Sequence, residues 1–204
     1  TETVSSDTFL PPIDAVRKTG SVGLPTHQLR VRIVDESGHD MPSDELGEII
    51  LRGPKVFVGY WNNPEAYKEV FVDGWFHTGD IGRLDSEGYL YIVDRKKDII
   101  ISGGENIAST EVERVIYEDP RVAECAVVGV QHERWGEVPC AYVVLKSDER
   151  ANANEIIDRC TESLAGFKVP KMVKFINTLP RNPSGKVLKR ELREQVDNAG
   201  SRDS

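Results

Sequence analysis

Residues 74–106 read GWFHTGDIGRLDSEGYLYIVDRKKDIIISGGEN. Two polar clusters flanked by glycine, one ending at Asp80 and one opening at Asp94, enclose a segment that is rich in tyrosine and β-branched residues, Gly88 to Val93. This composition after a Ser-Glu-Gly turn predicts a β-strand. A charged break and a second apolar run, Ile99 to Ile101, follow. A charged break between two strands is more typical of a hinge or a ligand edge than of a core.

Several motifs in and beyond this stretch occur together in one enzyme family. They are TGD at Thr78 to Asp80, DRKKD at Asp94 to Asp98, SGGEN at Ser102 to Asn106 and NPSGKVLKREL at Asn182 to Leu192. In order and spacing they resemble the motifs of the AMP-forming acyl-CoA synthetases, the fatty-acid and other carboxylate–CoA ligases of the adenylate-forming superfamily. Motifs in register are more specific than one glycine-rich loop. The resemblance implies that this chain is the C-terminal portion of such an enzyme.

Length and composition predict a soluble, cytoplasmic protein. The chain has 204 residues, enough for one large or two small domains, with 39% hydrophobic and 29% charged residues. It contains no apolar run long enough to span a bilayer and no N-terminal signal pattern. Cys125, Cys140 and Cys160 are odd in number and lack metal-ligand spacing, so we expect reduced thiols rather than disulfides or a zinc site.

The net charge of −8 argues against nucleic acid or an anionic membrane as the main partner. Basic residues nevertheless gather at Arg95 to Lys97 and between Lys186 and Arg193. Such clusters can bind a small polyanion, and solvated basic faces are the alternative.

The pattern of the chain predicts an α+β fold. Gln28 to Val34 and Glu48 to Arg52 are short strands separated by turns. The resemblance implies that residues 1–96 form the β-rich end of the large N-terminal domain, with a short β-barrel remnant. It implies a small mixed α/β lid domain over residues 97–198, and we expect a disordered tail at 199–204.

Periodicity predicts the elements of the second half. A helix with an Asn63 cap is also expected just after that residue, because proline and glutamate follow it. The predicted helices are Ser109 to Tyr117, Asn154 to Leu164 with Asn154 as its cap, and Val187 to Val196; the predicted strands are Val122 to Val130, Ala141 to Leu145 and Val173 to Ile176.

Asp80 and Arg95 are the candidate ribose ligands. A short carboxylate after Thr-Gly can accept two hydrogen bonds from a vicinal diol, although turn or capping use is a common alternative. The resemblance implies that Asp80 and Arg95 bind the ribose of ATP and AMP; a surface salt bridge is the alternative for Arg95. By the same resemblance Thr1 lies at the nucleotide and Glu2 approaches magnesium, with a frayed terminus as the alternative.

Lys186 is the candidate catalytic residue. The preceding Asn-Pro-Ser-Gly sequence is turn chemistry that would lift its side chain off the surface. A long ammonium there can reach the α-phosphate and the attacking carboxylate, where negative charge gathers. An ordinary exposed lysine is the alternative. The resemblance implies that Lys186 serves adenylation and that Lys97 is the hinge about which the lid rotates.

Two glycines, Gly103 and Gly104, follow the Ile99 to Ile101 run, and residues without side chains would let a narrow ligand pass close to the backbone. The resemblance implies that this ligand is the pantetheine chain of coenzyme A. A plain turn is the alternative. The resemblance implies further contacts to coenzyme A from Glu105 and Lys168, and Arg134 is a candidate for the 3′-phosphate.

The resemblance therefore implies a ligase that joins a carboxylic acid to ATP, releases pyrophosphate and passes the acyl group from AMP to coenzyme A. ATP, Mg²⁺ and coenzyme A are the implied cofactor and co-substrates. Two alternatives remain open: an adenylation domain that loads a carrier protein, and a non-catalytic fragment that binds nucleotide or coenzyme A. The family's phosphate loop and acyl pocket are not among these residues, so we expect no adenylation by the chain alone.

Overall fold

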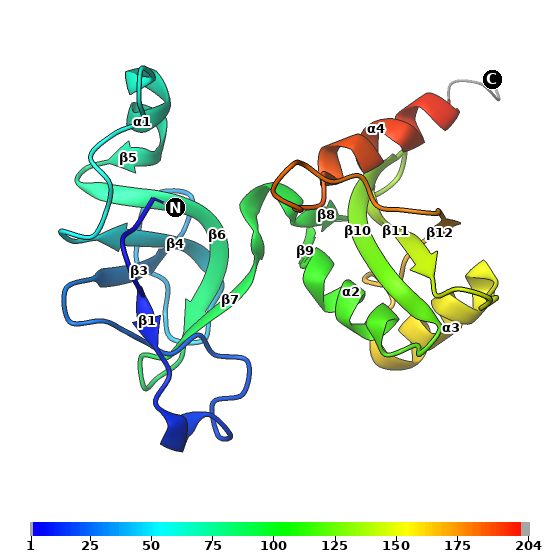
Figure 1. The fold of residues 1–204 in the computed structure, drawn as a ribbon, viewed down its shortest axis with the longest axis horizontal. Helices are drawn as coiled ribbons and strands as arrows, with labels where there is room; N and C mark the ends of the chain where they lie inside the picture. The colour runs from blue at the N-terminus through cyan, green and yellow to red at the C-terminus, as the bar shows by residue number, and fades with distance from the viewer. Residues whose placement is uncertain (1, 201–204) are drawn as a thin grey trace. The chain divides into compact units, whose positions relative to one another are not determined.

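The computed structural model describes residues 2–200, and the side chains of residues 2–195 (Figure 1). The chain divides into two compact units, Thr1–Lys97 and Asp98–Ser204. Helices and strands occur in both units, so the predicted α+β class is confirmed.

The first unit is mostly β-structure. Its strands β3, β4, β6 and β5 lie side by side in that order, β7 pairs with β6, and every pairing is antiparallel. Within the described residues this sheet does not close into a barrel. The elements are β1 (Thr8–Phe9), η1 (Pro12–Asp14), β2 (Leu24–Pro25), β3 (Arg30–Val34), β4 (Gly47–Arg52), α1 (Pro64–Val70), β5 (Phe71–Val72), β6 (Trp75–Leu84) and β7 (Leu90–Arg95).

The core of the first unit comes from alternate residues of these strands. Ile49 and Leu51 of β4 share one buried cluster with Ile33, Phe76 and Leu90. The period of two along β4 places these side chains on one face. The predicted strands β3 and β4 are confirmed, whereas the ten-residue β6 was not expected.

Helix α1 begins as its sequence predicts. The Asn63 side chain accepts a hydrogen bond from the Ala66 amide at 3.2 Å, and Pro64 occupies the first turn, where a missing N–H costs nothing.

The second unit contains one sheet, in the order β10, β11, β8, β9, with β12 added parallel to β11. A short 3-10 turn, η2, precedes it. This turn (Lys96–Asp98) includes the last two residues of the first unit and the first of the second. The further elements are β8 (Ile100–Ser102), β9 (Glu105–Ile107), α2 (Ser109–Tyr117), β10 (Val122–His132), β11 (Gly136–Leu145), α3 (Ala153–Ser163), β12 (Met172–Phe175) and α4 (Lys189–Gly200).

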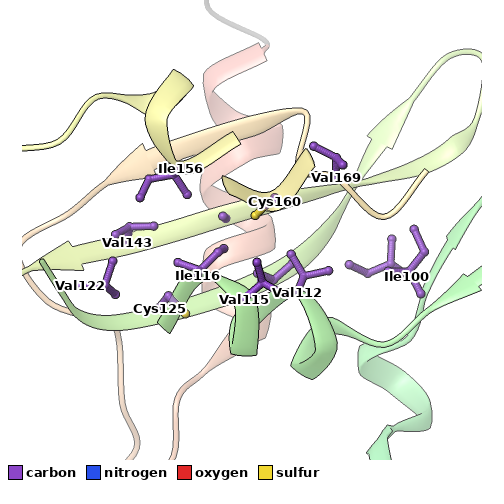
Figure 2. Packing of buried hydrophobic residues seen from close by; sticks show 13 residues of the cluster. Ile100, Val112, Val115, Ile116, Val122, Cys125, Val143, Ile156, Cys160 and Val169 are labelled. Carbon is purple, nitrogen blue, oxygen red and sulfur yellow. The ribbon is translucent and has the colours of Figure 1, made fainter. Parts of the chain in front are cut away.

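Both faces of this sheet are covered, which explains the nearly continuous apolar run of β10. Cys125 and Val127 pack with α2 and α3 in one cluster, shown in Figure 2. Ala126 and Val128 point to the other face and share a cluster with Leu192 of α4. A strand buried on both sides needs apolar residues at every position rather than at alternate ones.

The cap of α3 differs from the prediction. Asn152, not Asn154, accepts from the Glu155 amide, and the Glu155 carboxylate accepts from the Asn152 amide in return. This reciprocal pair of hydrogen bonds satisfies two free backbone donors. A cap at Asn154 could not form such a pair, because no glutamate lies three residues after it.

Helix α4 begins at Lys189, two residues later than predicted, because Val187 forms an antiparallel β-bridge with Arg181 and so is extended rather than helical. The helix continues to Gly200. From residue 201 onward, the tail predicted at 199–204 lies outside the described residues.

Candidate active site

Asp80 and Arg95 meet across two neighbouring strands. Asp80 lies in β6, opposite Arg95 at the end of β7, and the Arg95 Nε lies 2.7 Å from the Asp80 Oδ1. Their side chains are 27% and 53% exposed, so both remain open to a ligand. The sequence did not predict the strand around Asp80; it offered a surface salt bridge as the alternative for Arg95, but did not indicate Asp80 as the partner.

The TGD motif forms a bulge in β6. Glu48 pairs with Ile81 and Ile50 pairs with His77, so the residues Thr78 to Asp80 lie opposite Ile49 alone. The Thr78 hydroxyl donates to the Ile49 carbonyl at 2.7 Å and accepts from the Asp80 amide at 3.0 Å. Bulges re-aim side chains next to functional sites.

Glu48 is the residue that the sequence analysis missed. Its side chain is 11% exposed and lies below the bulge, where one carboxylate oxygen accepts from the Gly79 amide at 3.2 Å. Its other oxygen lies 3.1 Å from the Lys96 ammonium and 3.3 Å from the His77 Nδ1. No local signal reveals Glu48, because these partners lie about 30 to 50 residues further along the chain.

Lys97, the predicted hinge, is exposed and lies in η2 between β7 and β8. It is the last residue of the first unit. The following residue, Asp98, is buried in the second unit, where its carboxylate lies 2.7 Å from the Arg193 guanidinium.

The Lys186 side chain stands on a tight turn that its own residues hold together. The Asn182 side-chain oxygen accepts from the amides of Ser184 and Lys186, at 3.1 and 2.9 Å. The Gly185 amide donates to the Asn182 carbonyl, and the Asn182 amide donates to the Lys186 carbonyl. Lys186 is exposed, and its ammonium makes no hydrogen bond or ion pair with the described residues of its own unit.

Two basic residues attach this turn to the rest of the second unit. Arg181 donates to the Gly185 carbonyl at 2.7 Å and pairs with Glu124 at 2.9 Å. On the other side, the Lys189 ammonium lies 2.8 Å from the Glu113 carboxylate and donates to the buried Ser109 hydroxyl at 2.6 Å.

Gly103 and Arg134 lie against one exposed indole, that of Trp135. The Gly103 amide donates to the Trp135 carbonyl, and a Cβ on Gly103 would lie 2.9 Å from the indole ring. The Arg134 guanidinium lies over the same ring, 4.5 Å from its centre. Gly104 has a φ of +90° and open space around it, and Glu105 is exposed at the start of β9.

Lys168 has a different environment. Its ammonium donates to both carboxylate oxygens of Glu111 in the first turn of α2, at 2.8 Å each. The lysine side chain is 23% exposed. Lys168 thus serves as a link to α2, and a ligand would have to compete with Glu111 for it.

Of the two terminal candidates, Thr1 lies outside the described residues. Glu2 accepts a hydrogen bond from the Tyr60 hydroxyl at 3.3 Å, and its backbone carbonyl accepts from the Phe57 amide. In residues 2–195, no group of three or more His, Cys, Asp or Glu side chains is arranged to hold a metal ion.

The three cysteines are buried and free, as expected. Burial raises the pKa of Cys125 to about 12 and the pKa values of Cys140 and Cys160 to about 11. These thiols therefore stay protonated at neutral pH and act as core residues. No helix in the described part of the chain has the length and apolar character needed to cross a membrane.

Two family profiles match the chain. The profile of the AMP-binding enzymes matches residues 1–61, and that of the AMP-binding enzyme C-terminal domain matches residues 111–186. The chain belongs to the AMP-binding enzymes. The family resemblance noted from the motifs is thereby confirmed.

Among AMP-binding enzymes, the chain is similar to a feruloyl-CoA synthase from an Amycolatopsis species, with 46% identity over 195 residues. The match covers 96% of this chain and 40% of that relative. The chain thus spans less than half the length of this curated relative.

Solved structures of AMP-binding enzymes share the fold. An o-succinylbenzoate CoA synthetase from Bacillus subtilis, in complex with its acyl-adenylate intermediate, has a TM-score of 0.89 and 42% identity, covering 94% of this chain and 39% of that chain. The same enzyme with ATP and magnesium ion gives a TM-score of 0.87. An amide bond synthetase from Marinactinospora thermotolerans has a TM-score of 0.82 and 36% identity, covering 91% of this chain and 39% of that chain.

Proposed function

We propose that this chain is the C-terminal part of an AMP-forming carboxylate–CoA ligase. The intact enzyme joins a carboxylic acid to ATP, releases pyrophosphate, and then transfers the acyl group from AMP to the thiol of coenzyme A. Activation as an adenylate supplies the good leaving group that a bare carboxylate lacks. The observation that carries the proposal is the Lys186 turn, which presents an exposed ammonium on a hydrogen-bonded frame.

In this reaction Asp80 and Arg95 bind the ribose. The Asp80 carboxylate accepts hydrogen bonds from the two hydroxyls, while the ion pair with Arg95 keeps it oriented. Lys186 stabilises the negative charge at the α-phosphate and the attacking carboxylate. Because that charge grows in the transition state, Lys186 acts on rate rather than on substrate binding.

The two units take the roles of the two family domains in this proposal. Residues 1–96 are the barrel remnant of the large domain, and residues 97–198 are the lid, which turns about Lys97 between the two half-reactions. The exposed η2 turn between the two units supports a hinge there, because a few exposed residues can absorb a change of backbone torsion.

The second half-reaction uses the surface around Trp135. Gly103 and Gly104 leave the backbone accessible to the pantetheine chain, and Arg134 offers a cation to the 3′-phosphate. Glu105 lies beside this surface on β9. Lys168 contributes only when its ammonium exchanges the Glu111 carboxylate for coenzyme A.

Magnesium fits the nucleotide site if phosphate oxygens complete its coordination. Mg²⁺ is usually bound through one or two carboxylates together with substrate phosphates, and Glu2 supplies one carboxylate. Thr1 lies beside it in the sequence as the nucleotide contact. The ion would neutralise phosphate charge during adenylation.

An acceptor other than coenzyme A is the second candidate. The likeness to an amide bond synthetase favours it, because that relative is named for joining acids to amines with the same fold. An adenylation domain that loads a carrier protein belongs to the same class. A fragment that binds nucleotide or coenzyme A without turnover is the remaining alternative for the chain alone.

The test measures, at near-neutral pH, thioester formation from ATP, coenzyme A and a panel of fatty and aromatic acids. Three proteins are compared: a full-length enzyme containing this chain, its Lys186→Ala variant and this chain alone. We expect product only from the first. Adenylate without thioester would replace coenzyme A by another acceptor, and a thioester formed by this chain alone would overturn the assignment as an inactive part.

A further inference from the structure

Glu48 of β4 contacts the segments that carry the proposed nucleotide-binding residues Asp80 and Arg95, but it is not itself one of those residues. Its side chain is 11% exposed and contacts the Gly79 amide and His77 of β6 and Lys96, which directly follows β7. Burial opposes ionisation of this carboxyl, yet hydrogen bonds from Lys96 and His77 outweigh it and hold its pKa below the ordinary value. A largely shielded, ionised carboxylate that contacts both β6 and the end of β7 holds these segments to β4.

The first contact holds the bulge that carries Asp80. Three residues of β6 face one residue of β4, so the Gly79 amide has no partner in the ladder between these strands. Glu48 accepts this amide at 3.2 Å, next to the Thr78 hydroxyl bond to Ile49. A buried amide without an acceptor is costly, so Glu48 stabilises this form of the bulge over others.

The second contact holds the end of β7. The Lys96 ammonium lies 3.1 Å from the other oxygen of Glu48, and Lys96 directly follows Arg95 in the chain. One carboxylate therefore fixes both strands at the point where Asp80 and Arg95 pair.

We propose that Glu48 is a positioning residue for the nucleotide site: it holds the Gly79 bulge and Lys96, and thereby sets the geometry of the Asp80–Arg95 pair that receives the ribose. Glu48 itself touches no substrate in this account. The proposal rests on the proposed function, because it assumes that Asp80 and Arg95 bind ATP.

The test uses a full-length enzyme with Glu48→Ala, Glu48→Gln or Lys96→Met, and ATP binding is measured together with pyrophosphate release. Glu48→Ala removes both contacts, and we expect the KM for ATP to rise by about tenfold while kcat changes less than about threefold. Glu48→Gln keeps an acceptor for the Gly79 amide, so we expect a smaller rise. Lys96→Met, which keeps the bulge contact, should resemble Glu48→Gln.

The matched control is Glu65→Gln, which neutralises an exposed carboxylate paired with Lys68 at 2.8 Å on α1. We expect its KM to equal that of the wild type. A second readout is amide hydrogen exchange at Gly79 in this chain, which should quicken in Glu48→Ala and not in the control.

The outcomes separate the two proposals. A wild-type enzyme that does not bind ATP overturns both. If the wild type adenylates its acid and Glu48→Ala merely lowers the melting temperature, with an unchanged KM for ATP, the proposed function stands and the positioning role fails. Unchanged exchange at Gly79 also contradicts the positioning role.

Discussion

The side chains of Asp80 and Lys186 are held in place in opposite ways. The Asp80 carboxylate is held within a sheet by a bulge, an ion pair and the strands on both sides. The Lys186 ammonium stands on an exposed turn whose hydrogen bonds come mainly from Asn182. A binding group gains from being fixed before its ligand arrives, whereas a group that must reach a developing charge needs a firm base and a free end. The comparison predicts that the two sites respond differently to mutation.

The largest effects should separate binding from rate. In a full-length enzyme, Lys186→Ala should lower kcat for adenylation by about 10²- to 10³-fold, because it removes charge stabilisation made in the transition state. Asp80→Ala should mainly raise the KM for ATP, by about tenfold or more, because its contacts form on binding. Pyrophosphate release over a range of ATP concentrations measures both. Equal changes in the same parameter would end the contrast between the two sites.

The partly buried Lys189–Glu113 pair beside the Lys186 turn is expected to contribute more to the free energy of unfolding than the exposed Arg190–Glu194 pair. Lys189→Met leaves the Glu113 carboxylate without its cation at a position where both side chains are 16% exposed. We expect the free energy of unfolding of the second unit to fall by about 2 kcal/mol. Arg190→Met is the control, because this neighbouring side chain is 84% exposed and pairs at 3.5 Å with Glu194. Urea unfolding of the chain measures both variants. Equal losses of unfolding free energy would show that the Lys189 pair is no more stabilising than an exposed one.

Two glycines offer a matched pair across the comparison. Gly79 in the bulge and Gly185 in the turn have φ values of +70° and +85°, and each has open space for a Cβ. Alanine in this conformation costs about 1 kcal/mol. We expect the full cost at Gly79, because the sheet cannot relax, and a smaller one at Gly185, because an exposed turn can shift. Amide exchange in each unit reports the two costs, and a larger loss at Gly185 would reverse the comparison.

The last prediction concerns pH and lies away from both sites. Hydrogen bonds from Arg121 lower the pKa of Asp119 to about 2, against the opposing effect of burial. Because the folded-state pKa is lower than the unfolded value of about 3.9, this stabilisation is complete above that value and is lost as the pH falls toward 2.

Arg121→Gln should therefore be less stable than the wild type at pH 7, and the difference should shrink between pH 4 and pH 2. Denaturant unfolding across this range provides the measurement. The exposed Lys68→Gln is a control whose difference from the wild type should stay small throughout. A pH-independent difference for Arg121→Gln would mean that its effect arises from packing.

Much of the second unit could be predicted from local pattern. The bounds of α2 agree with its helical period, and β10 was recognised from its apolar run. The cap of α3 was misplaced by two residues because both Asn152 and Asn154 are good caps, and only the reciprocal contact with Glu155 distinguishes them. Strand β6 was missed because a glycine such as Gly79 of the TGD bulge is typical of a turn, although here it marks an irregular strand.

The sequence by itself determined which residues are candidates and which elements surround most of them. The resemblance of its motifs to those of a known family singled out Asp80, Arg95 and Lys186, and periodicity indicated the helices and the buried strands, since both signals are carried by neighbouring residues. Only the tertiary structure decided that Asp80 pairs with Arg95 and that Glu48 accepts the Gly79 amide of the bulge that contains Asp80. Those contacts join strands distant in sequence, and strand register depends on packing of the whole sheet, which no local pattern records.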